Sequence, residues 1–158
     1  MAGRWRKEIG FPVTAAVVIL ADQFTKVWAK SALEDAAPPP EHYVARLTYV
    51  ENTGAAFGLL TNQHFLIAFA VLMVIATVVI FYRFPMWNHP LLKIGLGMVL
   101  GGALGNLIDR LRLGYVVDFI DFRVWPVFNL ADSSITIGII MLAFYFIFLF
   151  KEKEKADE

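Results

Sequence analysis

The chain has 158 residues, of which 58% are hydrophobic and 18% charged, and its formal net charge is zero. So large an apolar fraction excludes an ordinary water-soluble domain, and zero net charge gives no electrostatic basis for binding nucleic acid. The chain has no cysteine, which excludes disulfides and thiol catalysis. His42, His64 and His89 lie too far apart for a zinc-ligand motif, so we expect neither a metal nor any other cofactor.

Four stretches are long and apolar enough to be predicted as transmembrane helices. A bilayer core requires about 20 mostly apolar residues per helix. The candidate stretches are residues 9–29, 65–84, 91–108 and 133–150. Backbone groups in lipid have no water to bind, so each stretch is expected to be helical. The predicted fold class is therefore all-α: one membrane-embedded domain over residues 1–158, with four transmembrane helices and a small β-rich extracytoplasmic cap.

Basic residues lie mainly on one side of the predicted helices. That side carries residues 4–7, the loop 83–93 and the charged tail 151–158, whereas the long segment 30–64 on the other side is acidic on balance. Cytoplasmic loops are rich in lysine and arginine, so we expect both termini in the cytoplasm and segment 30–64 outside. The basic N-terminus before an apolar run also fits a secretory signal peptide, but no small-residue cleavage site follows promptly.

The outer segment 30–64 is predicted to form the cap. The run from Tyr43 to Val50 alternates loosely and is rich in β-branched and aromatic residues, which favours one or two short strands. Three prolines at 38–40 form a stiff linker before this run, and Asn52 and Gly54 mark a turn after it.

Glycines recur every four residues in the third predicted helix, at Gly97, Gly101 and Gly105. This spacing puts them on one helix face, where the missing side chains allow a neighbouring helix to approach closely in lipid. We therefore expect a packing role for them.

Polar side chains gather at the outer ends of the first and third helices, where burial in a membrane is costly and polar groups commonly serve function. Asp22 and Lys26 are four residues apart, so they share a helix face and are expected to form an ion pair. Asn106, Asp109 and Arg110 crowd the end of the third helix. Because Asp109 and Arg110 are adjacent, they point in different directions and are not expected to neutralise each other there.

Asp118 and Asp132 are the strongest candidates for catalysis, because each lies in an apolar setting at an outer boundary. If the chain between them folds back, the two carboxyls can meet, and two adjacent carboxyls share a proton because they do not both ionise cheaply. The ionised member can then deprotonate water, while the protonated member donates a hydrogen bond to the carbonyl under attack. A simpler alternative remains open for one of them: Asp132 or Ser133 can cap the fourth helix.

Five short blocks, weak singly but specific together, alternate with the predicted helices. They are DQFTK at 22–26, NTGAAF at 52–57, GGALGNLIDR at 101–110, VDF at 117–119 and FNLAD at 128–132. On these blocks the chain resembles, over essentially its whole length, the lipoprotein signal peptidases of bacteria (signal peptidase II).

The resemblance implies an intramembrane aspartyl endopeptidase of the bacterial plasma (inner) membrane. Such enzymes remove the signal peptide of a prolipoprotein just before a diacylglyceryl-modified cysteine. The implied partners are this lipidated substrate and membrane lipid, with no cofactor and no nucleic acid. The implied active site lies near the outer face of the membrane, beneath a strand-rich cradle and a short outer helix within residues 30–64.

The resemblance also implies roles for ten residues of this chain. Asp118 and Asp132 correspond to the catalytic pair. Asn52, Gly54, Asn106, Arg110 and Asn129 correspond to residues around the substrate backbone and the dyad. Asp22, Lys26 and Asp109 are implied to be structural, although the residues alone would also nominate Asp109 as a third acid.

Two functions of other classes compete with the protease. A proton-coupled transporter would use Asp22, Asp109 and Asp118 as a relay, but it favours acids near the bilayer midplane and internal repeats. Here the acids lie at the outer boundary and the sequence shows no repeat. A non-catalytic scaffold would tolerate conservative substitution of Asp118 and Asp132, which an enzyme would not.

Overall fold

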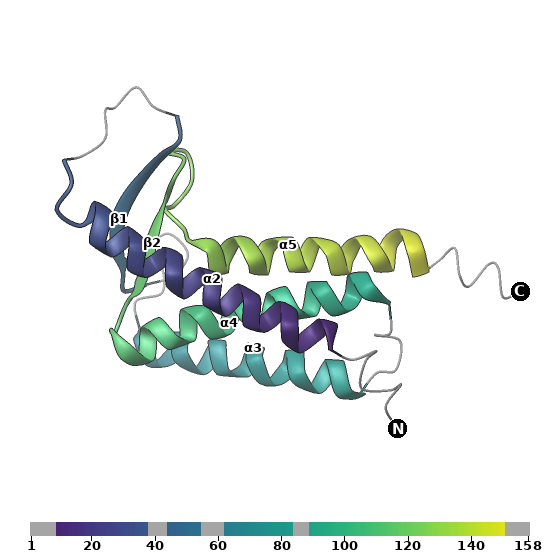
Figure 1. Cartoon of the computed structure of the whole chain (residues 1–158). Coiled ribbons are helices and arrows are strands. Elements are labelled where there is room, and N and C mark those ends of the chain that lie inside the picture. The colour runs from purple at the N-terminus through teal and green to yellow at the C-terminus, as the bar shows by residue number, and fades with distance from the viewer. Residues whose placement is uncertain (1–8, 38–43, 55–61, 84–88, 151–158) are drawn as a thin grey trace, which may run out of the picture.

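Four long helices lie side by side and form the body of the molecule (Figure 1). The computed structural model describes residues 9–37, 44–54, 62–83 and 89–150. Within these ranges the helices are α2 (Gly10–Leu33), α3 (Gln63–Arg83), α4 (Pro90–Arg112) and α5 (Leu130–Phe144), and a π-helical turn, η2 (Tyr145–Leu149), continues α5. Each helix, with η2 counted as part of α5, is long and apolar enough to cross a membrane. The predicted fold class is confirmed in its helices.

Helix α4 occupies the centre of the bundle and packs against the other three helices. In its most apolar window 72% of the residues are buried, against 22% or less in the others. Glycine makes this possible: a Cβ atom added at Gly97 or Gly101 would lie 2.7 Å from a side-chain carbon of α2. A Cβ at Gly102 would collide with the Ala131 carbonyl of α5. The predicted packing role of the α4 glycines is confirmed, and it serves two neighbouring helices.

The two ends of the bundle differ in chemistry. Where α2 begins and α5 ends, the core is apolar, and Phe11 of α2 stacks on Phe81 of α3 with ring centroids 4.0 Å apart. Large apolar side chains such as Leu20, Leu72 and Ile140 stay exposed along the outside of the bundle, as a surface facing lipid requires. The opposite end, which we call the sheet end, carries most of the buried polar and charged side chains.

A two-stranded antiparallel sheet covers the sheet end (Figure 1). Strand β1 (Arg46–Asn52) was predicted in part, whereas β2 (Val116–Asp121) was not predicted as a strand. In the register, Val50 lies opposite Asp118. The sheet therefore brings a residue from the predicted cap next to one of the candidate aspartates.

Several predicted features lie outside the described residues. These are the basic N-terminal residues 4–7, the prolines at 38–40, Tyr43, block residues 55–57, residues 84–88 of the loop 83–93 and the tail 151–158. The predicted short outer helix is not among the elements of the described part of segment 30–64.

Candidate active site

The chain between Asp118 and Asp132 folds back on itself, as the dyad hypothesis required. Ile120 of β2 and Phe128 exchange backbone hydrogen bonds of 2.9 and 3.1 Å, which closes a tight loop between them. At its tip, Arg123 has a φ of 63°, a left-handed backbone conformation. The return of the chain places Asn129 beside Asp118, with Asn129 Nδ2 donating to Asp118 Oδ1 over 2.6 Å.

Helix α5 begins directly after this contact, and Asn129 is its N-cap. The side chain of Asn129 accepts a hydrogen bond from the backbone N–H of Asp132, and Asp132 Oδ2 accepts one from the backbone N–H of Asn129. Such a reciprocal capping box satisfies two backbone donors at once. Asp132 therefore helps to cap the fourth helix, as the simpler alternative held, but it does so from the third helical position, and the N-cap itself is Asn129. The helix starts three residues earlier than predicted, because Asn129 already supplies the cap oxygen.

Three asparagine side chains hold the two aspartates. Asp118 accepts from Asn129 and, at its other oxygen, from Asn52 Nδ2 of β1 over 2.8 Å. Asp132 Oδ1 accepts from Asn106 Nδ2 of α4, also over 2.8 Å. The side-chain donors in these three contacts are all neutral amides.

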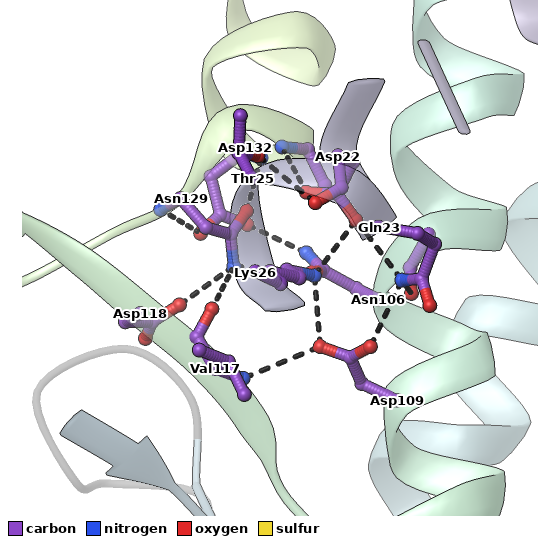
Figure 2. A network of polar contacts seen from close by, with 12 residues as sticks. Asp22, Gln23, Thr25, Lys26, Asn106, Asp109, Val117, Asp118, Asn129 and Asp132 are labelled. Carbon is purple, nitrogen blue, oxygen red and sulfur yellow. Dashed lines mark hydrogen bonds and ion pairs between the residues drawn. The ribbon is translucent and has the colours of Figure 1, made fainter. Parts of the chain in front are cut away.

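A separate cluster of charges lies behind the asparagines, between α2 and α4 (Figure 2). Lys26 Nζ lies 2.9 Å from Asp22 Oδ2 and 2.9 Å from Asp109 Oδ2, and all three side chains are at least 96% buried. The expected Asp22–Lys26 ion pair is present, and Asp109 joins it. Gln23 completes this charge cluster by donating to Asp109 Oδ1 over 2.9 Å.

The charge cluster also ties neighbouring backbone into place. Asp22 Oδ1 accepts from the backbone N–H of Ala131 at the start of α5, over 2.9 Å. Asp109 Oδ2 accepts from the backbone N–H of Val117 in β2, over 3.2 Å. Each candidate aspartate thus follows directly after a residue held by the cluster, so the cluster fixes the backbone from which both carboxyls project.

A cavity of about 480 Å³ opens where the sheet meets the helices. Asp118 and Asp132 both line it, and so do four of the five residues predicted to surround them. The lining residues are Val50, Asn52, Gly54, Asn106, Arg110, Val116, Asp118, Trp125, Pro126, Val127, Phe128, Asp132 and Thr136. Its wall is therefore mostly apolar, with two acids, one guanidinium and two amides converging on it, which is the usual composition of a substrate site.

The environment of Asp118 favours its protonated form. Burial raises the pKa of this carboxyl to about 7, and the negative charge of Asp132 adds to the rise, while the hydrogen bonds from Asn52 and Asn129 oppose it. Only 1% of Asp118 is exposed, whereas Asp132 is half-buried. The two carboxyls thus differ in solvation although they share one cavity.

The structure brings all ten sequence-predicted site residues to the sheet end. Six of them line the cavity, Asn129 lies against both aspartates, and Asp22, Lys26 and Asp109 form the charge cluster behind. Sequence reasoning missed the roles of Gln23, Trp125 and Thr136. Thr136 could have been found, because it lies four residues after Asp132 and so shares its helix face. Trp125 could not, since its place depends on the fold-back loop.

The chain is similar to known proteins over most of its length. The family model for signal peptidase (SPase) II matches residues 14–148. The lipoprotein signal peptidase of Halothermothrix orenii is 44% identical over 84% of this chain and 92% of its own length. That of Pelotomaculum thermopropionicum is 48% identical over 83% of this chain and 87% of its own.

A solved structure supports the fold. This bacterial membrane enzyme, obtained by the in meso method at 2.3 Å resolution, superposes with a TM-score of 0.73. It is 32% identical to this chain, and the match covers 90% of this chain and 88% of the solved one. Sequence and fold therefore point to the same group of membrane enzymes.

Proposed function

The chain belongs to the signal peptidase II family of membrane proteases, and from this premise we propose that it removes signal peptides from diacylglyceryl-modified prolipoproteins by aspartyl catalysis. In this proposal Asp118 and Asp132 are the catalytic residues. The observation that supports it best is their shared cavity, in which both carboxyls accept hydrogen bonds from neutral amides.

The chemistry requires one proton between the two carboxyls. The ionised carboxyl takes a proton from a water molecule as the water oxygen bonds to the scissile carbonyl carbon. The protonated carboxyl donates a hydrogen bond to the carbonyl oxygen, which carries the developing negative charge. When the tetrahedral intermediate collapses, the C–N bond breaks and the amine of the cysteine leaves with a proton returned by the dyad.

The remaining cavity residues are proposed to hold the substrate. Asn52 and Gly54 line the cavity at the end of β1, where their polar groups can form hydrogen bonds with an extended substrate backbone. The guanidinium of Arg110 donates to the Asn106 carbonyl over a long 3.4 Å and keeps further N–H groups for a substrate carbonyl. The apolar wall, with Trp125 and Phe128, suits the lipid-modified end of the substrate.

The location of the cavity fits an active site near the outer face of the membrane. It lies at the sheet end of the helices, whereas the basic residues of segments 4–7, 83–93 and 151–158 precede α2, flank the connection between α3 and α4 and follow η2. We place both termini in the cytoplasm on this ground. A substrate helix embedded in lipid would then enter from the side and bring its lipidated cysteine between the bundle and the sheet.

The test uses purified full-length protein and a synthetic prolipoprotein peptide carrying a diacylglyceryl cysteine. Cleavage is followed by mass spectrometry, which identifies the bond broken. We expect a single cut before the lipidated cysteine, and no cut in a control peptide whose cysteine is unmodified. Equal cleavage of both peptides would contradict the proposed substrate.

The aspartyl mechanism is tested separately, with Asp118→Asn and Asp132→Asn. Each variant is expected to lose cleavage while its thermal unfolding in detergent stays close to that of the unmodified protein. Cleavage by the unmodified protein should persist in a metal chelator and after serine-directed reagents, because carboxyls alone activate the water. Near-normal turnover in either variant would favour the scaffold hypothesis.

A further inference from the structure

The amide orientations around the dyad are fixed by groups that can only donate. Asn129 Oδ1 accepts from the backbone N–H of Asp132 over 3.0 Å, so its NH₂ group must face Asp118. Asn52 Oδ1 accepts from the backbone N–H of Gly54 over 3.0 Å, so its NH₂ group also faces Asp118. Turning either amide over would set donor against donor on one side and oxygen against oxygen on the other.

Asn106 differs because the donor that fixes its orientation is a charged side chain. Lys26 Nζ donates to Asn106 Oδ1 over 2.8 Å, and Asn129 Nδ2 donates to the same oxygen over 3.1 Å. The opposite side of the amide, Nδ2, then donates to Asp132 Oδ1 over 2.8 Å. Figure 2 shows this line of contacts, with Asn106 between the ammonium and the aspartate.

Lys26 stands outside the cavity. It is not among the cavity residues, and only 3% of it is exposed. It therefore cannot touch a substrate in this structure, and its hydrogen-bond path to a carboxyl of the dyad runs through Asn106. Because an ammonium on the oxygen side of an amide polarises it, the N–H group on the other side becomes a stronger donor to an anion.

The two aspartates are placed unequally for carrying negative charge. Asp132 occupies the first turn of α5, where the aligned backbone N–H groups stabilise an anion. Asp118 lies on a strand and is almost fully buried. The hydrogen bond from Asn106 thus reaches the aspartate that lies in the first turn of a helix.

We infer that Lys26 is a positioning residue for catalysis: through the amide of Asn106 it fixes a hydrogen bond to Asp132 and so makes Asp132 the carboxylate that takes the proton from water. This inference rests on the proposed aspartyl mechanism and goes beyond a structural role for Lys26. It also assigns the proton: Asp118 holds it in the resting enzyme and donates it toward the scissile carbonyl.

Four charged groups on two helices lie close behind or beside the dyad and enter any pH dependence. Lys26 and Asp22 belong to α2, and Asp109 and Arg110 belong to α4. Asp22 and Asp109 both contact Lys26, so a substitution at either removes a charge from the same cluster. The Asp109 carboxylate contacts Lys26, Gln23 and the backbone N–H of Val117, so Asp109→Asn removes a charge of the same cluster and leaves the donor to Asn106 in place. It is therefore the matched control for Lys26→Met.

The experiment compares Lys26→Met with Asp109→Asn in full-length protein, with kcat and KM for the lipidated peptide measured as a function of pH. Loss of a hydrogen bond to a charged group predicts a fall in kcat of about 10- to 100-fold for Lys26→Met, with KM unchanged. The acidic limb of its kcat profile should move to higher pH by about one unit. Asp109→Asn should keep the pH profile of the unmodified protein.

The outcomes separate the possible failures. If Lys26→Met loses stability but keeps the kcat and pH profile of Asp109→Asn, Lys26 is structural only and the inference is wrong. If Lys26→Met does not fold, the double variant Lys26→Met/Asp109→Asn, which removes one charge of each sign, takes its place against Asp109→Asn. If Asp118→Asn or Asp132→Asn still cleaves, the proposed function itself fails, whatever the result at Lys26.

Discussion

Four carboxylates lie at the sheet end, and they form two pairs with opposite environments. Asp22 and Asp109 share the ammonium of Lys26, lie away from the cavity and are almost fully buried. Asp118 and Asp132 line the cavity and are held by neutral amides. We call the first pair the closed pair, because it shares one buried counter-ion. We call the second pair the open pair, because its hydrogen bonds come from neutral amides and leave it able to divide one proton.

This difference shows how a membrane protein can hold acids for two purposes, structure and proton transfer, at the same end of its helix bundle. A buried charge needs a partner, and one lysine serves two aspartates that in turn hold the backbone at Val117 and Ala131. Acids meant for proton transfer need the reverse: donors that orient them without neutralising them. Asparagine supplies such donors, since its amide carries no charge at any pH.

The largest effect on stability is expected at the closed pair. Lys26→Met leaves two buried carboxylates without their counter-ion, which costs about 3–5 kcal/mol in the free energy of unfolding. Denaturant unfolding in detergent measures it. Lys30→Met is the control on the same helix and should cost much less, because the Lys30 side chain is 43% exposed and solvent screens its ion pair with Glu34. Equal losses in the two variants would contradict the closed-pair description.

A smaller loss is expected where the closed pair is packed most tightly. A Cβ atom added at Gly105 would lie 2.5 Å from Asp22 Oδ2, so Gly105→Ala should push the carboxylate and cost about 1–3 kcal/mol. Gly10→Ala is its control, because the nearest atom to a Cβ there is 3.8 Å away. Thermal unfolding of the two variants checks the difference. A Gly105→Ala protein as stable as Gly10→Ala would show that the packing is loose.

The proton shared by the open pair should make kcat for cleavage depend on pH. With the pKa of Asp118 at about 7 against an ordinary 3.8, the folded protein holds a proton between these pH values that the unfolded chain has released. This group therefore lowers stability as pH rises through that window. Above about pH 7 the shared proton is lost, so kcat should fall about tenfold per pH unit.

A buried acid on the same strand provides the control for this profile. Asp121 pairs with Arg46 over 2.6 Å, which holds the pKa of Asp121 below its usual value. Asp121→Asn should therefore leave the pH profile unchanged. A profile of the unmodified protein that stays flat well above neutrality would remove the shared proton from the mechanism.

The smallest effect tests the neutral donors of the open pair. Asn52 donates to Asp118 Oδ2 and lowers its pKa, so Asn52→Ala should raise that pKa further. The basic limb of the kcat profile then moves to higher pH by about one unit or less. Tyr49→Phe, which removes a hydroxyl bound to Glu51 on the same strand, is expected to leave the limb in place. A shift to lower pH in Asn52→Ala would show that Asn52 does not support the anion.

The parts of the fold set by local patterns were predictable. Four apolar stretches gave four helices, and the glycine spacing of α4 predicted its close packing. The ends were less certain: α2 and α4 run four residues beyond their predicted ends, to Leu33 and Arg112. Polar residues at these ends satisfy one another within the folded protein, so the helices continue where hydropathy alone predicts that they stop.

The residues that form the site were predictable from the sequence, but their arrangement in space was predictable only in part. The spacing of Asp22 and Lys26 predicted their pairing, because both lie on one helix. That Asp109 completes the pair could not be predicted, since it depends on how α2 and α4 lie against each other. β2 and the fold-back at Phe128 also depend on pairing between distant segments, and so does the capping role of Asn129. None of these contacts follows from the local sequence pattern.

The most direct measurement is the rate of cleavage in four parallel variants, each with one aspartate replaced by asparagine. Asp118→Asn and Asp132→Asn should lose activity by about 100- to 10,000-fold, because each removes a proton-transfer group. Asp22→Asn and Asp109→Asn should keep cleaving at a rate within about tenfold of the unmodified protein, since each replacement leaves one acceptor oxygen for the backbone N–H it holds. Equal losses in all four variants, or activity in Asp118→Asn or Asp132→Asn, would contradict the division of the four acids into a closed and an open pair.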